Sequence, residues 1–143
     1  MHAQKIIRLY DERRFKRVSL KEIPLLASVP AGSTAMTFYP EHADRYVTVD
    51  NINDPTAFAL EVKGNSMAPK IENGDIVVVS PQQEVRNGDI CVVRVTDEDV
   101  LKKIRFVDDD VQLIPLNPAF KTVVVRKRDV IFAWKVVKVI KNI

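Results

Sequence analysis

The sequence predicts a single, mainly β domain that is curled or barrel-like, and three observations lead to this fold class. Short runs rich in β-branched residues recur beyond Tyr46, and such residues favour strands. Gly, Pro, Asn or Asp separates these runs at short intervals, as between the strands of an antiparallel sheet. Helical periodicity is scarce in the same region. A length of 143 residues and a hydrophobic content of 46% are enough for one core.

The N-terminal part of the chain differs from the rest. Residues 1–22 hold much of the basic excess and few apolar positions, so we interpret them as an arm or the remnant of a linker. Residues 23–45 mix prolines, a glycine and small residues with apolar ones, which predicts an extended, partly mobile segment that a protease could reach. The β-rich domain then occupies residues 46–143.

Within that domain the strand signals follow one another closely. Strands are expected at 58–62, 76–79, 90–95, 100–106, 111–114, 122–125 and 131–140. Two Asn-Gly-Asp sequences, at 73–75 and 87–89, each precede a strand, and their glycines can supply the positive φ of a tight turn. We expect two similar turns rather than a solenoid repeat. The apolar run 131–140 is a candidate dimer edge, because an unpaired hydrophobic strand invites association.

Composition excludes several function classes. Lys and Arg number 22 against 19 Asp and Glu, and a net charge of +3 is too small to argue for nucleic acid or membrane binding by itself. The single cysteine, Cys91, allows no intramolecular disulfide and no multi-cysteine metal site, which fits a reducing cytoplasm. No run of about 18 apolar residues and no signal peptide are present, so we expect a soluble protein. The three carboxylates of Asp108–Asp110 favour a solvated hairpin turn over a metal site.

Ser66 is the first candidate for chemistry. It lies in Lys63-Gly64-Asn65-Ser66-Met67, directly after a predicted strand. A serine in this position presents its hydroxyl together with nearby backbone N–H groups, here those of Ser66 and Met67, as a nucleophile and an oxyanion hole require. Taken alone, a Gly-x-Ser sequence in a loop is more often an ordinary turn.

Lys102 is the candidate base for Ser66. Alternation along a strand places Val100, Lys102, Ile104 and Phe106 on one face, and Lys103 on the other face with Leu101 and Arg105. An ammonium against apolar neighbours is poorly solvated, which lowers its pKa and favours the neutral amine that can accept a proton. Lys103 should stay solvated. The alternative is a lysine whose stem reaches water from a strand edge. A Ser-His-Asp triad is disfavoured, since His2 and His42 lie in polar segments that nothing ties to Ser66.

These residues resemble a known family in chain order. Gly64-Asn65-Ser66-Met67, the two Asn-Gly-Asp turns with their strands, Lys102-Lys103-Ile104 and the segment 111–118 are similar to the self-cleaving peptidase domain of LexA repressors, phage CI-type repressors and UmuD, the S24 serine–lysine peptidases. The resemblance runs from about Ile23 to Ile140. It implies a curled β-barrel of the LexA and signal-peptidase type with an extended N-terminal cleavage arm, Ser66 as nucleophile and Lys102 as base.

The resemblance also implies a substrate, and it implies partners. The family cuts its own chain at a small-residue bond upstream of the serine, and Leu25-Leu26-Ala27-Ser28-Val29-Pro30-Ala31-Gly32 is similar to that region, so Ala31–Gly32 is the candidate scissile bond. One departure is Pro30, directly before Ala31. Its fixed φ restricts how the backbone of the cleavage segment can approach Ser66. A homodimer, stimulation by an activated RecA filament, and operator DNA bound through a further N-terminal domain are implied, with no cofactor. The function expected is the C-terminal domain of a LexA-like SOS-response repressor. The alternatives are a UmuD-like subunit that serves a translesion polymerase and a non-catalytic dimerisation module.

Overall fold

The computed structural model describes residues 19–29, 43 and 45–142. In this part of the chain nine strands form one mixed sheet in the order β2-β1-β3-β4-β9-β5-β6-β7-β8, in which β1 and β3 pair in parallel and the other neighbours are antiparallel. The strands are β1 (Leu20–Val29), β2 (Arg45–Asp50), β3 (Phe58–Val62), β4 (Ile76–Ser80), β5 (Ile90–Val95), β6 (Glu98–Val107), β7 (Asp110–Ile114), β8 (Val123–Arg126) and β9 (Val130–Ile140). One 3-10 turn, Lys127–Asp129, precedes β9.

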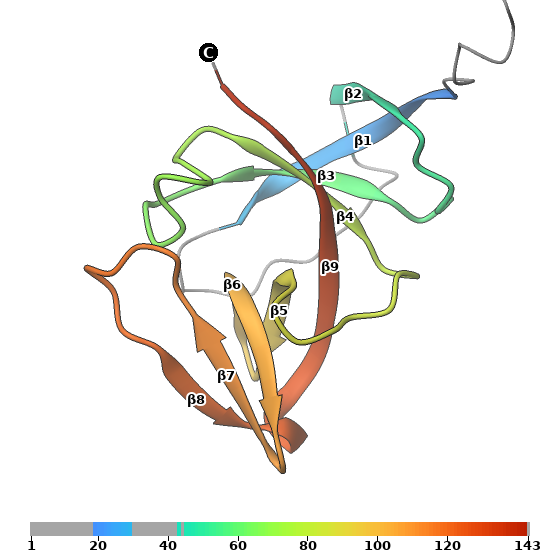
Figure 1. Cartoon of the computed structure of the whole chain (residues 1–143). Coiled ribbons are helices and arrows are strands. Elements are labelled where there is room, and N and C mark those ends of the chain that lie inside the picture. The colour runs from blue at the N-terminus through green and yellow to red at the C-terminus, as the bar shows by residue number, and fades with distance from the viewer. Residues whose placement is uncertain (1–18, 30–42, 44, 143) are drawn as a thin grey trace, which may run out of the picture.

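The mainly β prediction is therefore confirmed, but the sheet does not close into a barrel. Its end strands are β2 and β8, and they do not pair with each other in the described part of the chain. In Figure 1 β1 to β4 lie in the upper group and β5 to β8 in the lower group, and the long β9 runs through both. No helix among the described residues is long and apolar enough to cross a membrane.

The strand β9 joins the two groups because its halves have different partners. Val130–Lys135 pairs with β5, and Lys135–Ile140 pairs with β4. The expectation that this hydrophobic strand is a free dimer edge is wrong, since it lies in the middle of the strand order. Its apolar side chains pack against buried residues of the neighbouring strands on both faces of the sheet.

Alternation along the strands creates cores on both faces of the upper group. On β3, Phe58 and Leu60 enter a first core cluster while Ala59 enters a separate one, and β4 alternates in the same way. The first core cluster consists of Phe58, Leu60, Val62, Met67, Ile71, Val77, Val79, Val92 and Leu101. The second core cluster, Cys91, Val93, Val100, Ile104, Val111 and Leu113, fills the lower group.

Both Asn-Gly-Asp sequences form the expected turns. Gly74 and Gly88 have φ values of 91° and 94°, which L-residues with a side chain rarely adopt. In each turn the aspartate accepts a bond from the backbone N–H three residues earlier, at 2.8 Å in both cases. In both turns, which lead into β4 and β5, the glycine therefore supplies the positive φ and the aspartate closes the turn with a hydrogen bond.

The segment that leads toward Ala31 is extended, as expected, but its first part belongs to the sheet. Strand β1 starts before the predicted boundary at Ile23 and pairs with β2 on one side and β3 on the other. The division into residues 1–22, 23–45 and 46–143 thus stays a prediction. Ala31, Gly32, His2 and His42 lie outside the described residues.

Candidate active site

Ser66 lies in the loop between β3 and β4, where the backbone turns sharply after Val62. Gly64 has a φ of 92°, and its N–H donates to Asn73 Oδ1 at 2.9 Å. Ala68 N donates to the carbonyl of Asn65 at 3.1 Å, which closes a turn around Ser66. The glycine permits this path because it has no Cβ.

Two apolar side chains anchor the Ser66 loop to the first core cluster. Met67 is 2% exposed and Ile71 is fully buried, and Ile71 N donates to the carbonyl of Met67 at 3.0 Å. Ser66 itself is only 6% exposed. The hydroxyl is therefore held in a fixed place and is largely screened from bulk water.

Lys102 comes from β6, in the other group of strands. Val100 and Ile104 pack in the second core cluster, with Phe106 against it, whereas Leu101 packs in the first core cluster. Alternation thus places Lys102 on the face of Val100 and Ile104, the face predicted from the sequence. Its cross-strand partner is the fully buried Cys91.

The side chains of Lys102 and Ser66 meet. Lys102 Nζ donates to Ser66 Oγ at 2.8 Å, across 36 positions of sequence. Burial lowers the pKa of Lys102 below its ordinary value of 10.5, since desolvation disfavours the ammonium. The same distance lets the neutral amine accept the serine proton.

Lys103 shows why position on the strand matters. Like Lys102 it is half-buried, but alternation places its side chain on the opposite face of β6. Its backbone pairs with Ile90 of β5 and Ile114 of β7. The structure therefore brings Ser66, Met67 and Lys102 together at the end of β3, and the cleavage-site residues lie outside the part it describes.

Asn117 contacts the Ser66 loop, a contact that no sequence pattern predicted. Its Nδ2 donates to the carbonyl of Asn65 at 2.9 Å, and its backbone N–H donates to the carbonyl of Ser66 at 3.0 Å. The local signal was the sequence Asn117-Pro118-Ala119, in which an asparagine side chain closes a turn with the residue two positions on. Ala119 N does donate to Asn117 Oδ1, at 3.0 Å.

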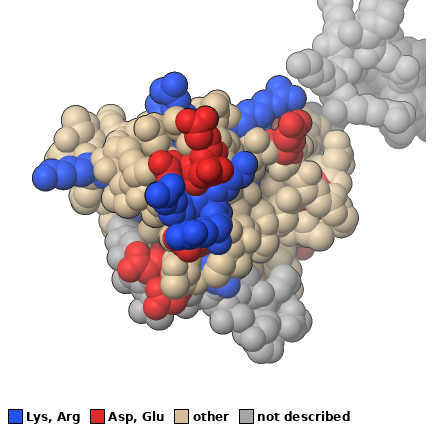
Figure 2. All heavy atoms as spheres, turned by 90° about the horizontal axis from the view of Figure 1, so that it is seen from below, with Lys and Arg blue, Asp and Glu red and all other residues tan. Residues whose placement is uncertain are grey.

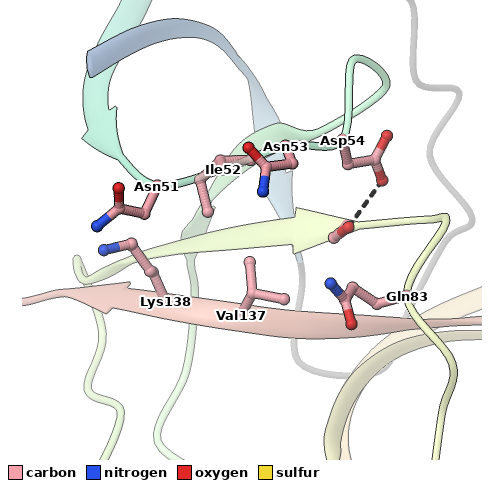
Figure 3. A pocket seen from close by; sticks show the side chains of 8 residues that line it. Asn51, Ile52, Asn53, Asp54, Gln83, Val137 and Lys138 are labelled. Carbon is pink, nitrogen blue, oxygen red and sulfur yellow. Dashed lines mark hydrogen bonds between the residues drawn. The ribbon is translucent and has the colours of Figure 1, made fainter. Parts of the chain in front are cut away.

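A second polar cluster surrounds Asp54, close to the start of β3. The buried carboxylate accepts bonds from Thr56 N, Thr56 Oγ1, Ser80 Oγ and Gln82 N at 2.6 to 2.9 Å. It borders a cavity of about 300 Å³, and Figure 3 shows the bond between Asp54 and Ser80. Every buried side-chain polar atom in the described residues has a partner, so the cluster is structural and leaves no group aimed at a ligand.

The remaining charged groups are mixed in sign. The Asp108-Asp109 turn joins β6 to β7 as the predicted hairpin, and Arg126 pairs with Asp110 at 3.3 Å. On the face drawn in Figure 2, Lys and Arg side chains lie directly beside Asp and Glu side chains. Among the described residues no group of three or more His, Cys, Asp or Glu side chains could hold a metal ion.

Comparison with known proteins identifies the family of this chain. The family model described as Peptidase S24-like matches residues 24–137. The LexA repressor of Polaromonas sp. strain JS666 is 34% identical over 129 residues, which cover 83% of this chain and 54% of that protein. The LexA repressor of Geotalea uraniireducens is 34% identical over 114 residues, which cover 78% of this chain and 56% of that protein. The chain therefore spans about half the length of these relatives, and it belongs to the Peptidase S24-like family.

Proposed function

We propose that this chain is the self-cleaving domain of a LexA-like repressor, in which Ser66 attacks the Ala31–Gly32 bond and Lys102 is the general base. The observation that carries the proposal is the 2.8 Å contact between Lys102 Nζ and Ser66 Oγ. A lysine that is desolvated by burial and hydrogen-bonded to a fixed serine has the two properties that a serine–lysine peptidase requires.

The chemistry follows from that contact. Ser66 Oγ adds to the carbonyl carbon of Ala31 while its proton passes to Lys102 Nζ. When the carbon–nitrogen bond breaks, Lys102 returns this proton to the leaving amine of Gly32. Lys102 then takes a proton from water, whose oxygen adds to the carbonyl carbon of the Ala31 ester. When the bond from this carbon to Ser66 Oγ breaks, Lys102 gives the proton to Ser66 Oγ, which releases the carboxyl group of Ala31 and restores the serine and the neutral amine. Backbone N–H groups beside Ser66 stabilise the negative oxygen in both steps.

The register of β1 supports cleavage within one chain. The backbone of Val29 pairs with that of Val62, Ala31 lies two residues after Val29, and Ser66 lies four residues after Val62. Two residues span at most about 7 Å when extended, so the distance along the chain from Val29 to Ala31 is short enough to support cleavage by Ser66 of the same chain. Leu26 packs against the first core cluster, which contains Met67, and this docks the segment. Strands β1 and β6 also approach each other, although they do not pair with each other in the sheet.

The repressor role rests on the relatives. Both are named LexA repressors, and about half of each lies outside the matched region. We therefore propose that operator binding belongs to a further domain, that the chain acts as a homodimer and that a RecA filament stimulates cleavage. These names favour the repressor over a UmuD-like polymerase subunit. On the face drawn in Figure 2, acidic side chains lie beside the basic ones, which fits a face that does not itself bind DNA.

Alkaline incubation followed by mass spectrometry of the intact chain tests the function. The parent should yield fragments 1–31 and 32–143, and Ser66→Ala and Lys102→Ala should yield none, because a general base contributes about 10²- to 10⁴-fold. Lys103→Ala is the matched control and should cleave like the parent. Fragments that persist in Ser66→Ala, or that end elsewhere than at Ala31, would contradict the proposal.

A further inference from the structure

Asn117 holds the peptide groups on both sides of Ser66. Its side-chain amide binds the carbonyl of Asn65 at 2.9 Å, and its backbone N–H binds the carbonyl of Ser66 at 3.0 Å. The carbonyl of Asn65 also accepts the N–H of Ala68 at 3.1 Å. Both carbonyls are therefore fixed from a segment that follows β7 and lies more than 50 positions away in sequence.

Fixing a carbonyl also fixes the N–H of the same peptide group. In a planar trans peptide the two groups point in opposite directions, and the one cis bond among the described residues is Ala68–Pro69. The carbonyl of Asn65 shares its peptide with the N–H of Ser66, and the carbonyl of Ser66 shares its peptide with the N–H of Met67. With both carbonyls turned toward Asn117, the N–H groups of Ser66 and Met67 are turned away from it.

These two N–H groups are available for a substrate. Within the described residues neither donates to a protein acceptor, although the neighbouring N–H groups of Gly64 and Ala68 both do. Available backbone donors beside a nucleophile are the elements of an oxyanion hole, provided that their direction is set before the reaction.

Only an amide meets the demands on the Asn117 side chain. Its Oδ1 accepts the N–H of Ala119 at 3.0 Å while its Nδ2 donates to Asn65. An aspartate would keep the first bond but would place a carboxylate oxygen against the carbonyl of Asn65. Alanine would lose both bonds.

We infer that Asn117 is a positioning residue that orients the Ser66 and Met67 N–H groups toward the oxyanion formed at the Ala31 carbonyl. The inference rests on the proposed function and extends it. It states that Asn117, which follows β7 in the lower group of strands, sets the direction of the N–H groups in the oxyanion hole. Asn117 acts through the loop and leaves the contact between Lys102 and Ser66 in place.

The test compares the first-order rate of self-cleavage, as a function of pH, for the parent, Asn117→Ala and Asn117→Asp. Both variants should cleave about 10- to 100-fold more slowly at the alkaline plateau, since a misplaced donor in such a site costs about 10²-fold. In Asn117→Ala the pH of half-maximal rate should match that of the parent, because Lys102 keeps its surroundings. Asn53→Ala and Asn53→Asp, at an exposed asparagine beside the Asp54 cavity, should cleave at the parent rate.

Backbone amide NMR provides a readout independent of cleavage. The Ser66 resonance should move or broaden in Asn117→Ala, which loses the side-chain bond to the Asn65 carbonyl, and stay unchanged in Asn53→Ala, while Trp134 fluorescence reports that both variants are folded. If the parent cleaves and Asn117→Ala cleaves at the same rate, or if the Ser66 amide does not change, the role of Asn117 is overturned and the proposed function stands. A parent that never cleaves overturns both.

Discussion

Replacing Asp54 by asparagine should lower the free energy of unfolding by about 2 to 4 kcal/mol at pH 7. Burial by itself raises the pKa of Asp54, but hydrogen bonds from Thr56, Gln82 and Ser80 outweigh it and lower the pKa from 3.8 to about 2. At about 1.4 kcal/mol per pKa unit, this preference for the ionised form stabilises the fold by about 2 kcal/mol. Asparagine also turns an amide donor toward the N–H of Gln82 or the N–H of Thr56, and an unpaired buried donor costs about 1 to 3 kcal/mol.

The pH dependence separates this cause from a simple packing defect. A carboxyl group whose pKa is lowered by folding stabilises the protein fully above its unfolded pKa, and this contribution is lost as the pH falls toward the folded value. For Asp54 the window runs from about pH 5 to about pH 2, and about half of the 2 kcal/mol is gone by pH 3. The parent should therefore lose more stability on acidification than Asp54→Asn does.

Urea unfolding measured at pH 7, 5 and 3 by the fluorescence of Trp134, the single tryptophan, gives the required free energies. Asp110→Asn is the matched control, because Asp110 forms a surface pair with Arg126 that contributes little. Self-cleavage of Asp54→Asn under folding conditions should match the parent, since Asp54 and Ser66 lie at opposite ends of β3. Parallel losses of stability with acid in the parent and in Asp54→Asn would refute the reasoning.

Three further predictions follow from single contacts. The rate of self-cleavage should rise with pH through the lowered pKa of Lys102 and level off above it, with a midpoint below 10.5 in a pH-rate profile; a flat profile would argue against an amine base. Gly88→Ala and Gly74→Ala should each cost about 1 to 2 kcal/mol because φ values of 94° and 91° are unfavourable for a residue with a Cβ, and the exposed Asn142 side chain, 2.9 Å from the new Cβ at position 74, can move aside; an unfolding midpoint that either variant leaves unchanged would contradict this. Burial and the nearby charge of Asp89 raise the pKa of Cys91 to about 12, so a thiol reagent should label the unfolded chain and leave the folded one unreacted, and rapid labelling of the folded chain would count against a buried thiol.

The strands that were predicted best are those whose apolar residues are buried on both faces. Phe58–Val62 and Ile90–Val95 begin and end at the predicted residues, because Gly, Pro or Asn-Gly-Asp sequences delimit them. The strand β2 was not predicted. Half of its residues are exposed at the end of the sheet and only Val49 is buried, so the apolar signal on which the prediction depends is weak there. Pairing of β1 with β2 and β3 depends on residues far along the chain, and local periodicity carries no information about it.

The position of Lys102 could be predicted, whereas its contact with Ser66 could not be derived from the strand pattern. Alternation fixes the face of a side chain, since the period of a strand is two residues. Distance between β6 and the Ser66 loop depends on how the two groups of strands are joined, and β9 sets that arrangement by pairing with both. The role inferred for Asn117 escaped prediction for the same reason, because the bonds connect segments more than 50 positions apart.

The placement of β9 connects the stability of the fold with its proposed chemistry. Ser66 follows β3, in the group of strands that β9 holds through β4, whereas Lys102 and Asn117 come from the group that it holds through β5. A change that loosens either half of β9 would therefore separate nucleophile from base without touching them. Since a displacement of about 1 Å can cost about 10²-fold in rate, self-cleavage should be lost before the global unfolding transition is reached. Hydrogen exchange along β9, compared with the cleavage rate as urea is added, would show whether the two decline together.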